Sequence, residues 1–416
     1  MTAEKSIADA FRTEGTDSVT FLPEPDPRPR HFPIISVDDH LVEPPDMFEG
    51  RLPAKFADRA PKMVEQADGR QVWQMEGMEL PNIGLNAVAG RPPAEYTVEP
   101  TRTEDMRRGC WQIDARIRDM DINGVYASIC FPSMLAGFAG QRFSELEDHE
   151  LGLATMRAWN DWHLEDWCGA YPDRMIPCQI TWFNDPEVSA EEVRRNAERG
   201  FKALSFTESP HKLGYPSLYS GHWDPLLAAC EETDTVVCLH VGSSSTTPVT
   251  SPDAPPDVAA ALFPMSAWHA AVDWVYSKVP LKFPEIKIVL TEGGISWVPG
   301  LIDRMKHSFK YHEFFGTWVG EDVQPVEVLK RNFYFCALDD PAGFALRNYI
   351  GVDHILVESD YPHGDGTWPD TQEILHRQMG DATHEEIALM THGNASRLFR
   401  HPVDPAWMET PVAAAS

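Results

Sequence analysis

Two stretches of the chain place acids and imidazoles directly after apolar, β-branched residues. IISVDDH ends with Asp38, Asp39 and His40, and ILVESDYPH ends with Asp360 and His363. Such apolar runs are typical of buried strands, in which residues i and i+2 share one face. Asp38 and His40 should therefore point the same way, with Asp39 opposite. Carboxylates and imidazoles together form a ligand set suited to zinc, with manganese or iron as alternatives.

Two further apolar runs end in residues of the same types. TVVCLHV carries His240, and IKIVLT is followed by Glu292 and two glycines. One such residue is weak support, because a single His or Asp at a strand end commonly has a structural role. Four strands ending alike favour a cation, because grouped carboxylates repel one another unless a partner offsets their charge. An open position on that ion would hold a water whose pKa is lowered toward neutrality.

Eight apolar runs must position these side chains. They lie at residues 34–38, 125–131, 175–181, 201–206, 235–241, 286–291, 332–338 and 354–359. Nearly continuous hydrophobic runs indicate parallel strands that are covered on both faces. Segments with helical spacing lie between them, so the sequence predicts an α/β fold, a (β/α)8 TIM barrel. A doubly wound open sheet is the alternative, but no GxGxxG turn follows the first strand.

The segments outside these strands predict a terminal arm, a tail and two long connections. Residues 1–30 are rich in Pro, Asp and Glu and predict an extended N-terminal arm, followed by the barrel over 31–400 and a C-terminal tail over 401–416. Residues 41–116 are a large insertion after the first strand, in which QVWQMEGMELP predicts a hairpin. The insertion could be a lid or pocket wall, or a surface excursion without contact to the chemistry. Residues 246–279 predict a second, mobile loop over the barrel mouth.

Composition and charge narrow the expected partners. The 416 residues are 43% hydrophobic and 24% charged, which is typical of a globular protein. The formal net charge of −29 argues against nucleic-acid and anionic-membrane partners. We expect a cytoplasmic protein, because the N-terminus has no signal-peptide pattern and no apolar stretch reaches membrane-spanning length. The seven cysteines have no CxxC spacing, which favours buried, reduced thiols.

The strand-end motifs resemble those of the amidohydrolase superfamily. DxH at Asp38–His40, CLHVG at His240, EGG at Glu292, SDYPH at Asp360 and the later GNASRLF are similar to its branch that includes aminocarboxymuconate-semialdehyde and resorcylate-type decarboxylases. The resemblance implies one divalent ion held by Asp38, His40, His240 and Asp360, with Asp360 also moving a proton. Those decarboxylases have a His before the paired glycines. Glu292 stands there in this chain, so it could be a further ligand, a proton carrier or a support for a loop.

Other residues are candidates for contact with substrate. His363 could act in catalysis by touching the substrate or orienting Asp360. The candidates for substrate binding are Ser133, Trp182, His269 and Arg304. Ser133 and Trp182 follow the second and third strands, His269 lies within 246–279, and Arg304 could pair with an anionic group. A purely structural role is the alternative for each of them.

Two functions remain open on the sequence. The leading one is a metal-dependent hydrolase or decarboxylase acting on a small carboxylated or amide-bearing ring compound. A decarboxylase would protonate the ring carbon from Asp360 or Glu292, whereas a hydrolase would direct an activated water at an amide, lactam or ester, with Asp360 carrying the proton. The alternative is a catalytically inactive barrel that binds ligands or supports an assembly. We expect a small carboxylate, aromatic or heterocyclic substrate, and a homodimer or higher homo-oligomer.

Overall fold

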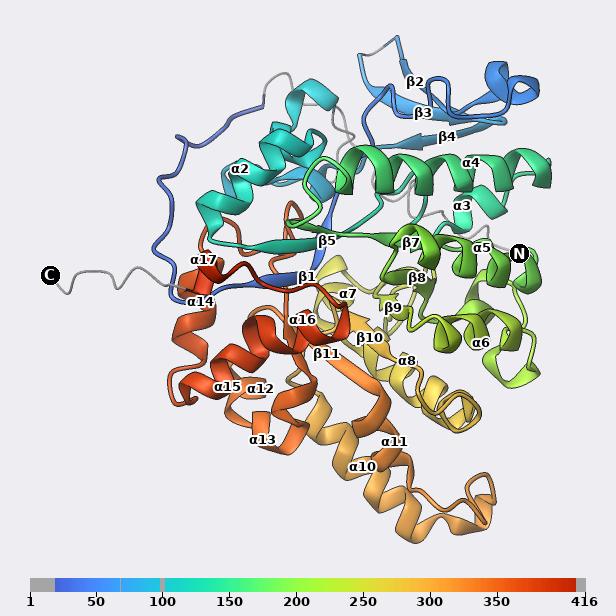
Figure 1. Ribbon diagram of the computed structural model, residues 1–416, viewed down its shortest axis with the longest axis vertical. Helices are drawn as coiled ribbons and strands as arrows, with labels where there is room; N and C mark the ends of the chain where they lie inside the picture. Colours follow the sequence, from blue (N-terminus) through green and yellow to red (C-terminus); the bar gives the residue numbers. More distant parts are fainter. Residues whose placement is uncertain (1–18, 68, 98–101, 409–416) are drawn as a thin grey trace, which may run out of the picture.

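The central feature of the computed structural model, which describes residues 19–67, 69–97 and 102–408, is a parallel sheet (Figure 1). Its nine strand segments run in the order β6-β5-β1-β12-β11-β10-β9-β8-β7. The outermost segments, β6 (Met175–Ile176) and β7 (Cys178–Ile180), are one strand interrupted at Pro177. Because β6 pairs with β5 and β7 pairs with β8, the sheet closes on itself. The interruption suits proline, which has no N–H for a ladder hydrogen bond. The predicted (β/α)8 barrel is confirmed.

The predicted strands are all present, because each apolar run is buried on both faces. Besides β6 and β7, they are β1 (Ile35–His40), β5 (Ala127–Phe131), β8 (Ala203–Thr207), β9 (Val236–His240), β10 (Ile288–Thr291), β11 (Phe333–Ala337) and β12 (Ile355–Val357). One buried cluster takes residues from every one of these strands, including Val37, Cys238 and Val289, and so fills the barrel interior. A larger cluster joins the outer strand faces to the helices. This two-sided burial explains the continuous hydrophobic runs.

Helices surround the barrel (Figure 1). They are α2 (Ile113–Asn123), α3 (Gln141–Ser144), α4 (His149–Trp162), α5 (Pro186–Arg199), α6 (Asp224–Glu232), α7 (Pro256–Leu262), α8 (Met265–Tyr276), α9 (Val279–Lys282), α10 (Val298–Tyr311), α11 (Pro325–Asn332), α12 (Pro341–Ala345), α13 (Arg347–Ile350), α14 (Thr371–Gln378), α15 (His384–Ala388), α16 (Asn394–Leu398) and α17 (Pro405–Met408). The loop predicted over 246–279 is wrong in one respect, since α7 and α8 occupy most of it. None of the helices among the described residues is long and apolar enough to cross a membrane.

The insertion over residues 41–116 forms a small antiparallel sheet of its own. Its strands are β2 (Lys62–Glu65), β3 (Gln71–Met75) and β4 (Met78–Pro81), and the β3–β4 pair confirms the predicted hairpin. Phe48 joins this sheet to the barrel side, with its ring 5.9 Å from that of Trp73 and 6.3 Å from that of Phe143. Figure 1 shows the sheet beside α4, remote from α10.

The described part of the N-terminal arm, residues 19–30, is extended and lies against its own barrel. The Arg28 guanidinium is 2.7 Å from the Asp370 carboxylate, and its backbone N–H donates to the carbonyl of Ile122. The Arg30 guanidinium lies 4.4 Å from the ring of Trp407 in the C-terminal segment. The remainder of the arm and of the predicted tail, 1–18 and 409–416, lies outside the described residues. All seven cysteines are buried and free, as predicted.

Candidate metal centre

Four strands deliver the predicted chemistry to one end of the barrel. β1, β9, β10 and β12 each lead into it, and the side chains brought together there are Asp38, His40, His240, Glu292, Asp360 and His363. Their ligand atoms form two overlapping groups, each spanning no more than 4.8 Å. All but Glu292 and His363 are completely buried, and these two are only 10% and 11% exposed. Parallel strands place their carboxyl ends at the same edge, so residues far apart in sequence become neighbours.

The distances among these atoms match those expected around one divalent ion. Nε2 of His40 lies 3.0 Å from Nε2 of His240, and Oδ1 of Asp38 lies 3.4 Å from each of them. Glu292 Oε2 is 3.3 Å from the His240 nitrogen, and Asp360 Oδ1 is 3.5 Å from that of His40. Ligands about 2.1 Å from an ion, at octahedral or tetrahedral angles, are about 3.0–3.4 Å apart. The residues present therefore fit a divalent metal ion.

Hydrogen bonding points to the same conclusion. In the described part of the chain, both carboxylate oxygens of Asp38 and of Asp360 are buried without a hydrogen-bond partner. Nδ1 of His240 lies 2.6 Å from the carbonyl of Val241, so its N–H donates there and leaves the Nε2 lone pair directed at the centre. Among the described residues, no Lys or Arg is ion-paired with any of the six side chains. A cation is the partner that these buried acids lack.

Two buried acids at the centre, Asp360 and Glu358, resist ionisation in the protein alone, whereas, despite burial, the neighbouring imidazoles of His240 and His40 keep the pKa of Asp38 below its usual range. Burial raises the pKa of Asp360 well above its usual range, and the charges of Glu292 and Asp38 add to this effect. Burial likewise raises the pKa of Glu358, which the charges of Asp38 and Asp360 increase further. Protons therefore neutralise part of this charge in the protein without metal, and a bound divalent cation would take over that role.

The same carboxylates favour the protonated form of two of the three imidazoles, His240 and His363, whereas burial and the neighbouring His363 lower the pKa of His40. Burial alone would lower the pKa of His240, but Asp38 and Glu292 outweigh it and raise that pKa to about 9. Burial is outweighed again at His363, where Asp360 and Glu292 raise the pKa to about 10. The local excess of negative charge thus outweighs burial at His240 and His363.

Two of the carboxylates are attached to backbone in a sparsely populated conformation. Glu292 has φ 58° and Asp360 has φ 51°, in the left-handed region that side chains rarely adopt. The backbone N–H of Glu292 donates to the Glu358 carboxylate at 3.2 Å, and that of Asp360 donates to the carbonyl of Asp38 at 2.9 Å. The next residue, Gly293, has no room for a side chain, because a Cβ would lie 2.5 Å from that of Ala267. The surrounding structure therefore fixes both acids in place.

Asp39 points away from the centre, as the alternation predicts, and fastens β1 to the loop that follows β12. Its carboxylate accepts hydrogen bonds from the hydroxyls of Ser128 and Ser359 and from the backbone N–H of Tyr361. The guanidinium of Arg116, which is fully buried, lowers the pKa of Asp39 against the larger upward effect of burial. Arg116 also donates to the carbonyl of His40. The register of β1 against β5 shifts between Ser36 and Asp39, which is typical of strand ends at functional sites.

We predict that Asp39→Ala destabilises the protein by about 3 kcal/mol, because it removes the buried negative charge that offsets Arg116 and takes an acceptor from three buried hydroxyls, those of Ser36, Ser128 and Ser359. Denaturant unfolding of the metal-loaded protein measures this loss. Asp46→Ala is the control, since Asp46 is exposed, and it should change the unfolding free energy by less than about 0.5 kcal/mol. A loss at Asp39 no larger than that of the control would contradict the assigned role.

Two of the predicted substrate residues make structural contacts. The hydroxyl and the backbone N–H of Ser133 both donate to the buried carboxylate of Glu43. Trp182 is buried, with ring atoms 3.1 Å from where a Cβ on Gly152 of α4 would lie. Their predicted part in substrate binding stays a prediction without support from their placement.

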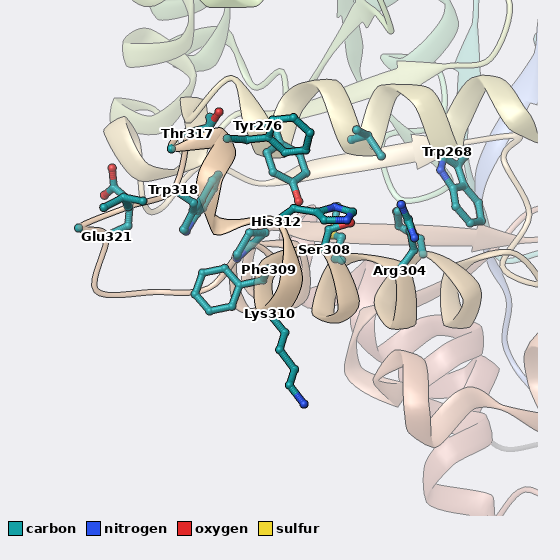
Figure 2. A pocket seen from close by; sticks show the side chains of 18 residues that line it. Trp268, Tyr276, Arg304, Ser308, Phe309, Lys310, His312, Thr317, Trp318 and Glu321 are labelled. Atoms are coloured by element: carbon teal, nitrogen blue, oxygen red, sulfur yellow. The ribbon is translucent and has the colours of Figure 1, made fainter.

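The other two predicted substrate residues lie in separate cavities. Arg304 lines a cavity of about 970 Å³ between α8 and α10 (Figure 2), together with Trp268, Tyr276 and Ser308. His269 lines a second cavity of about 630 Å³. None of the six residues of the metal centre lines either one within the described chain. The larger cavity is thus separate from the metal centre.

Aromatic residues missed in the sequence cover the imidazoles of the centre. The ring of Phe138 stacks on His240, with centroids 4.7 Å apart and planes inclined by 9°, and meets His40 edge-on at 5.4 Å. Phe131, the last residue of β5, lies 5.0 Å from His240. The signal in the sequence was the segment after the second strand, FPSMLAGF, which carries both rings. They shield the centre from water on this side.

A closed parallel barrel with a carboxylate and imidazole centre at the carboxyl ends of its strands defines a class of metal-dependent enzymes. A family model described as "Amidohydrolase" matches residues 40–401, most of the sequence. The chain belongs to the amidohydrolase family, and it is a metal-dependent hydrolase or carboxy-lyase. No curated protein matches the chain.

Solved structures share the fold at low sequence identity. An amidohydrolase from Mycobacterium avium subsp. paratuberculosis is 24% identical, with a TM-score of 0.69 over 89% of this chain and 99% of its own. A 5-carboxyvanillate decarboxylase from Novosphingobium aromaticivorans, bound to manganese and a nitrobenzoic acid, is 18% identical, with a TM-score of 0.60 over 91% of this chain and 100% of its own. A 2,6-dihydroxybenzoate decarboxylase from Rhizobium is 15% identical, with a TM-score of 0.57 over 89% of this chain and 99% of its own.

Proposed function

We propose that this protein decarboxylates a small aromatic carboxylate at a single divalent ion in the barrel mouth. The observation that carries the proposal is the spacing of Asp38, His40 and His240 as ligands of one ion, with the acid Asp360 directly beside them. Decarboxylases of ring carboxylates among the structures with this fold support the choice of reaction.

The ion would be held by Asp38, His40, His240 and Asp360, with Glu292 as a further ligand. A divalent ion at this position supplies Lewis-acid polarisation of the carboxylate and adjacent oxygen of a bound substrate. Zinc, the expectation from the sequence, fits the imidazoles, and manganese fits a set so rich in carboxylates. Manganese in one structure of the same fold supports it as the first ion to test.

Asp360 and His363 form the proton-carrying pair in this proposal. Oδ1 of Asp360 lies 3.1 Å from Nδ1 of His363, within ion-pair distance of a protonated imidazole. The His363 ring stacks on that of His40 at 3.6 Å, which fixes its orientation. Asp360 would donate the proton to the ring carbon as carbon dioxide leaves. His363, at the outer side of the pair, would then give a proton back to Asp360.

The insertion supplies part of the pocket wall in this proposal. The carbonyl of Leu85 accepts from the backbone N–H of Gly364, and the carbonyl of Pro362 accepts from that of Val88. These bonds tie the insertion to the loop that carries His363. Contacts of this kind support a wall over the centre for the segment near residues 82–96. The expected homo-oligomer stays a prediction.

Hydrolysis is the second candidate, and Glu292 favours it. The decarboxylases that the sequence resembles have a His at this position. Glu292 Oε1 lies 3.9 Å from Nδ1 of His363 and so adjoins the same proton-carrying pair. In a hydrolase, Asp360 would take a proton from the attacking water and pass it to the leaving group.

We expect the manganese-loaded protein to release carbon dioxide from at least one member of a panel of hydroxybenzoates. The assay measures carbon dioxide and the decarboxylated phenol together, so that the two products must appear in equal amounts. Matched benzamides and aryl esters of the same rings form the comparison panel. Turnover of the amides or esters alone would contradict decarboxylation and establish hydrolysis.

A further inference from the structure

The smaller cavity, of about 630 Å³, has the size of a small-molecule site and adjoins the metal centre. Glu208, which lines it, directly follows Thr207, and Thr207 is paired in register with His240. Ser243 joins the two sites: its hydroxyl donates to the carbonyl of His240 at 2.6 Å and accepts from the backbone N–H of Glu208 at 3.0 Å. Ser243 therefore connects the cavity to a proposed metal ligand through two hydrogen bonds.

The carboxylate of Glu208, a residue that lines the cavity, has one oxygen without a hydrogen-bond donor. One oxygen, Oε1, accepts from the hydroxyl of Ser244 at 2.5 Å. The other, Oε2, is buried and has no hydrogen-bond partner in the described part of the chain, although Glu208 is only 3% exposed. A buried carboxylate oxygen without a donor is unfavourable, so it marks a position where a bound group can donate.

The opposite wall of the cavity is one face of α8. Ser266, His269 and Asp273 recur there at helical spacing, and the Ser266 hydroxyl is also buried without a partner among the described residues. Trp268 and Tyr219 add aromatic surface. The two acids outnumber the one lysine that lines the cavity, Lys212, so its charge favours a cationic or hydrogen-bond-donating group.

We propose that this cavity is a substrate subsite in which Glu208 and Ser266 bind an N–H or O–H donor, such as an ammonium or hydroxyl group. The inference rests on the proposed function, because the carboxylate end of the same molecule would occupy the metal centre. It adds a specificity: the preferred ring carboxylates carry a protruding amine or alcohol. Glu208 is a binding residue here and takes no part in the proton transfer.

Calorimetric binding of simple probes to the manganese-loaded protein tests the subsite separately from the reaction. Benzylamine, benzyl alcohol and toluene share a ring and differ in the donor. We expect benzylamine or benzyl alcohol to bind at least about tenfold more tightly than toluene, since only the first two can donate a hydrogen bond to the carboxylate. Which of the two binds better tells whether an ammonium or a hydroxyl is preferred.

Substitutions test whether Glu208 is responsible for the tighter binding of the donor probes. Glu208→Gln should weaken the donor probe about tenfold or more and leave toluene unchanged, whereas Glu385→Gln, at an exposed carboxylate on α15, should change neither. His240→Ala should leave benzylamine binding intact, so a failed metal centre is distinguishable from a failed subsite. Equal binding of all three probes to the unaltered protein would overturn the proposal, and so would donor binding that Glu208→Gln leaves unchanged.

Discussion

Replacing His240 with alanine should remove the bound metal and lower turnover by more than about 100-fold. His240 contributes the nitrogen that lies nearest to three other ligand atoms, those of His40, Asp38 and Glu292. Loss of a residue that only supports a metal ligand typically costs 10–100-fold, so loss of a ligand should cost more. Elemental analysis of the purified variant and steady-state turnover measure the two effects on one preparation.

His384→Ala is the matched control for that variant, because His384 is an exposed imidazole at the start of α15. It should keep both the metal content and the turnover of the unaltered protein. A His240 variant that retains stoichiometric metal would contradict the assignment of this residue. Circular dichroism before the assays confirms that both variants are folded.

Asp360→Asn should lower turnover by about 10²–10⁴-fold, the usual contribution of a positioned acid or base, and leave much of the metal bound. Asparagine keeps the shape of the side chain but cannot hold the proton that Asp360 would donate. Three other ligands, Asp38, His40 and His240, would still hold the ion. Metal content and turnover of this variant are measured under saturating manganese.

Glu292→Gln tests which of the two acids, Asp360 or Glu292, carries the proton. If Asp360 is the proton carrier, the Glu292 variant should lose much less turnover than the Asp360 variant under the same conditions. The reverse order would move the proton-carrying role to Glu292. Glu292 is well placed to show such a difference, since it is held by Glu358 and faces His363.

The strands could be predicted because barrel strands are buried on both faces and therefore read as continuous apolar runs. The break of the third strand at Pro177 could not be predicted, because the sequence shows one continuous run and only the structure shows that its two halves pair with different neighbours. The helices α7 and α8 were also missed. Alanine and proline dominate this region, and Pro264 separates the two helices without a polar boundary.

The six residues of the metal centre could be predicted for a geometric reason. Each lies near the carboxyl end of a parallel strand or in the loop directly after it, and all such strands end at the same edge of the barrel. Arg304 does not share this property. It is the seventh residue of α10, which begins at Val298, and so belongs to the outer helix layer. Phe138 was missed because its own backbone is left-handed, with φ 66°, and turns the loop back toward the centre. No local sequence pattern predicts such a turn.

Anomalous X-ray diffraction from crystals of the manganese-loaded protein would test most directly whether these side chains share one ion. The expected result is a single strong peak about 2.0–2.3 Å from Nε2 of His40, Nε2 of His240 and Oδ1 of Asp38. A manganese-loaded crystal with no peak among these atoms, or with its only peak elsewhere, would contradict the assignment.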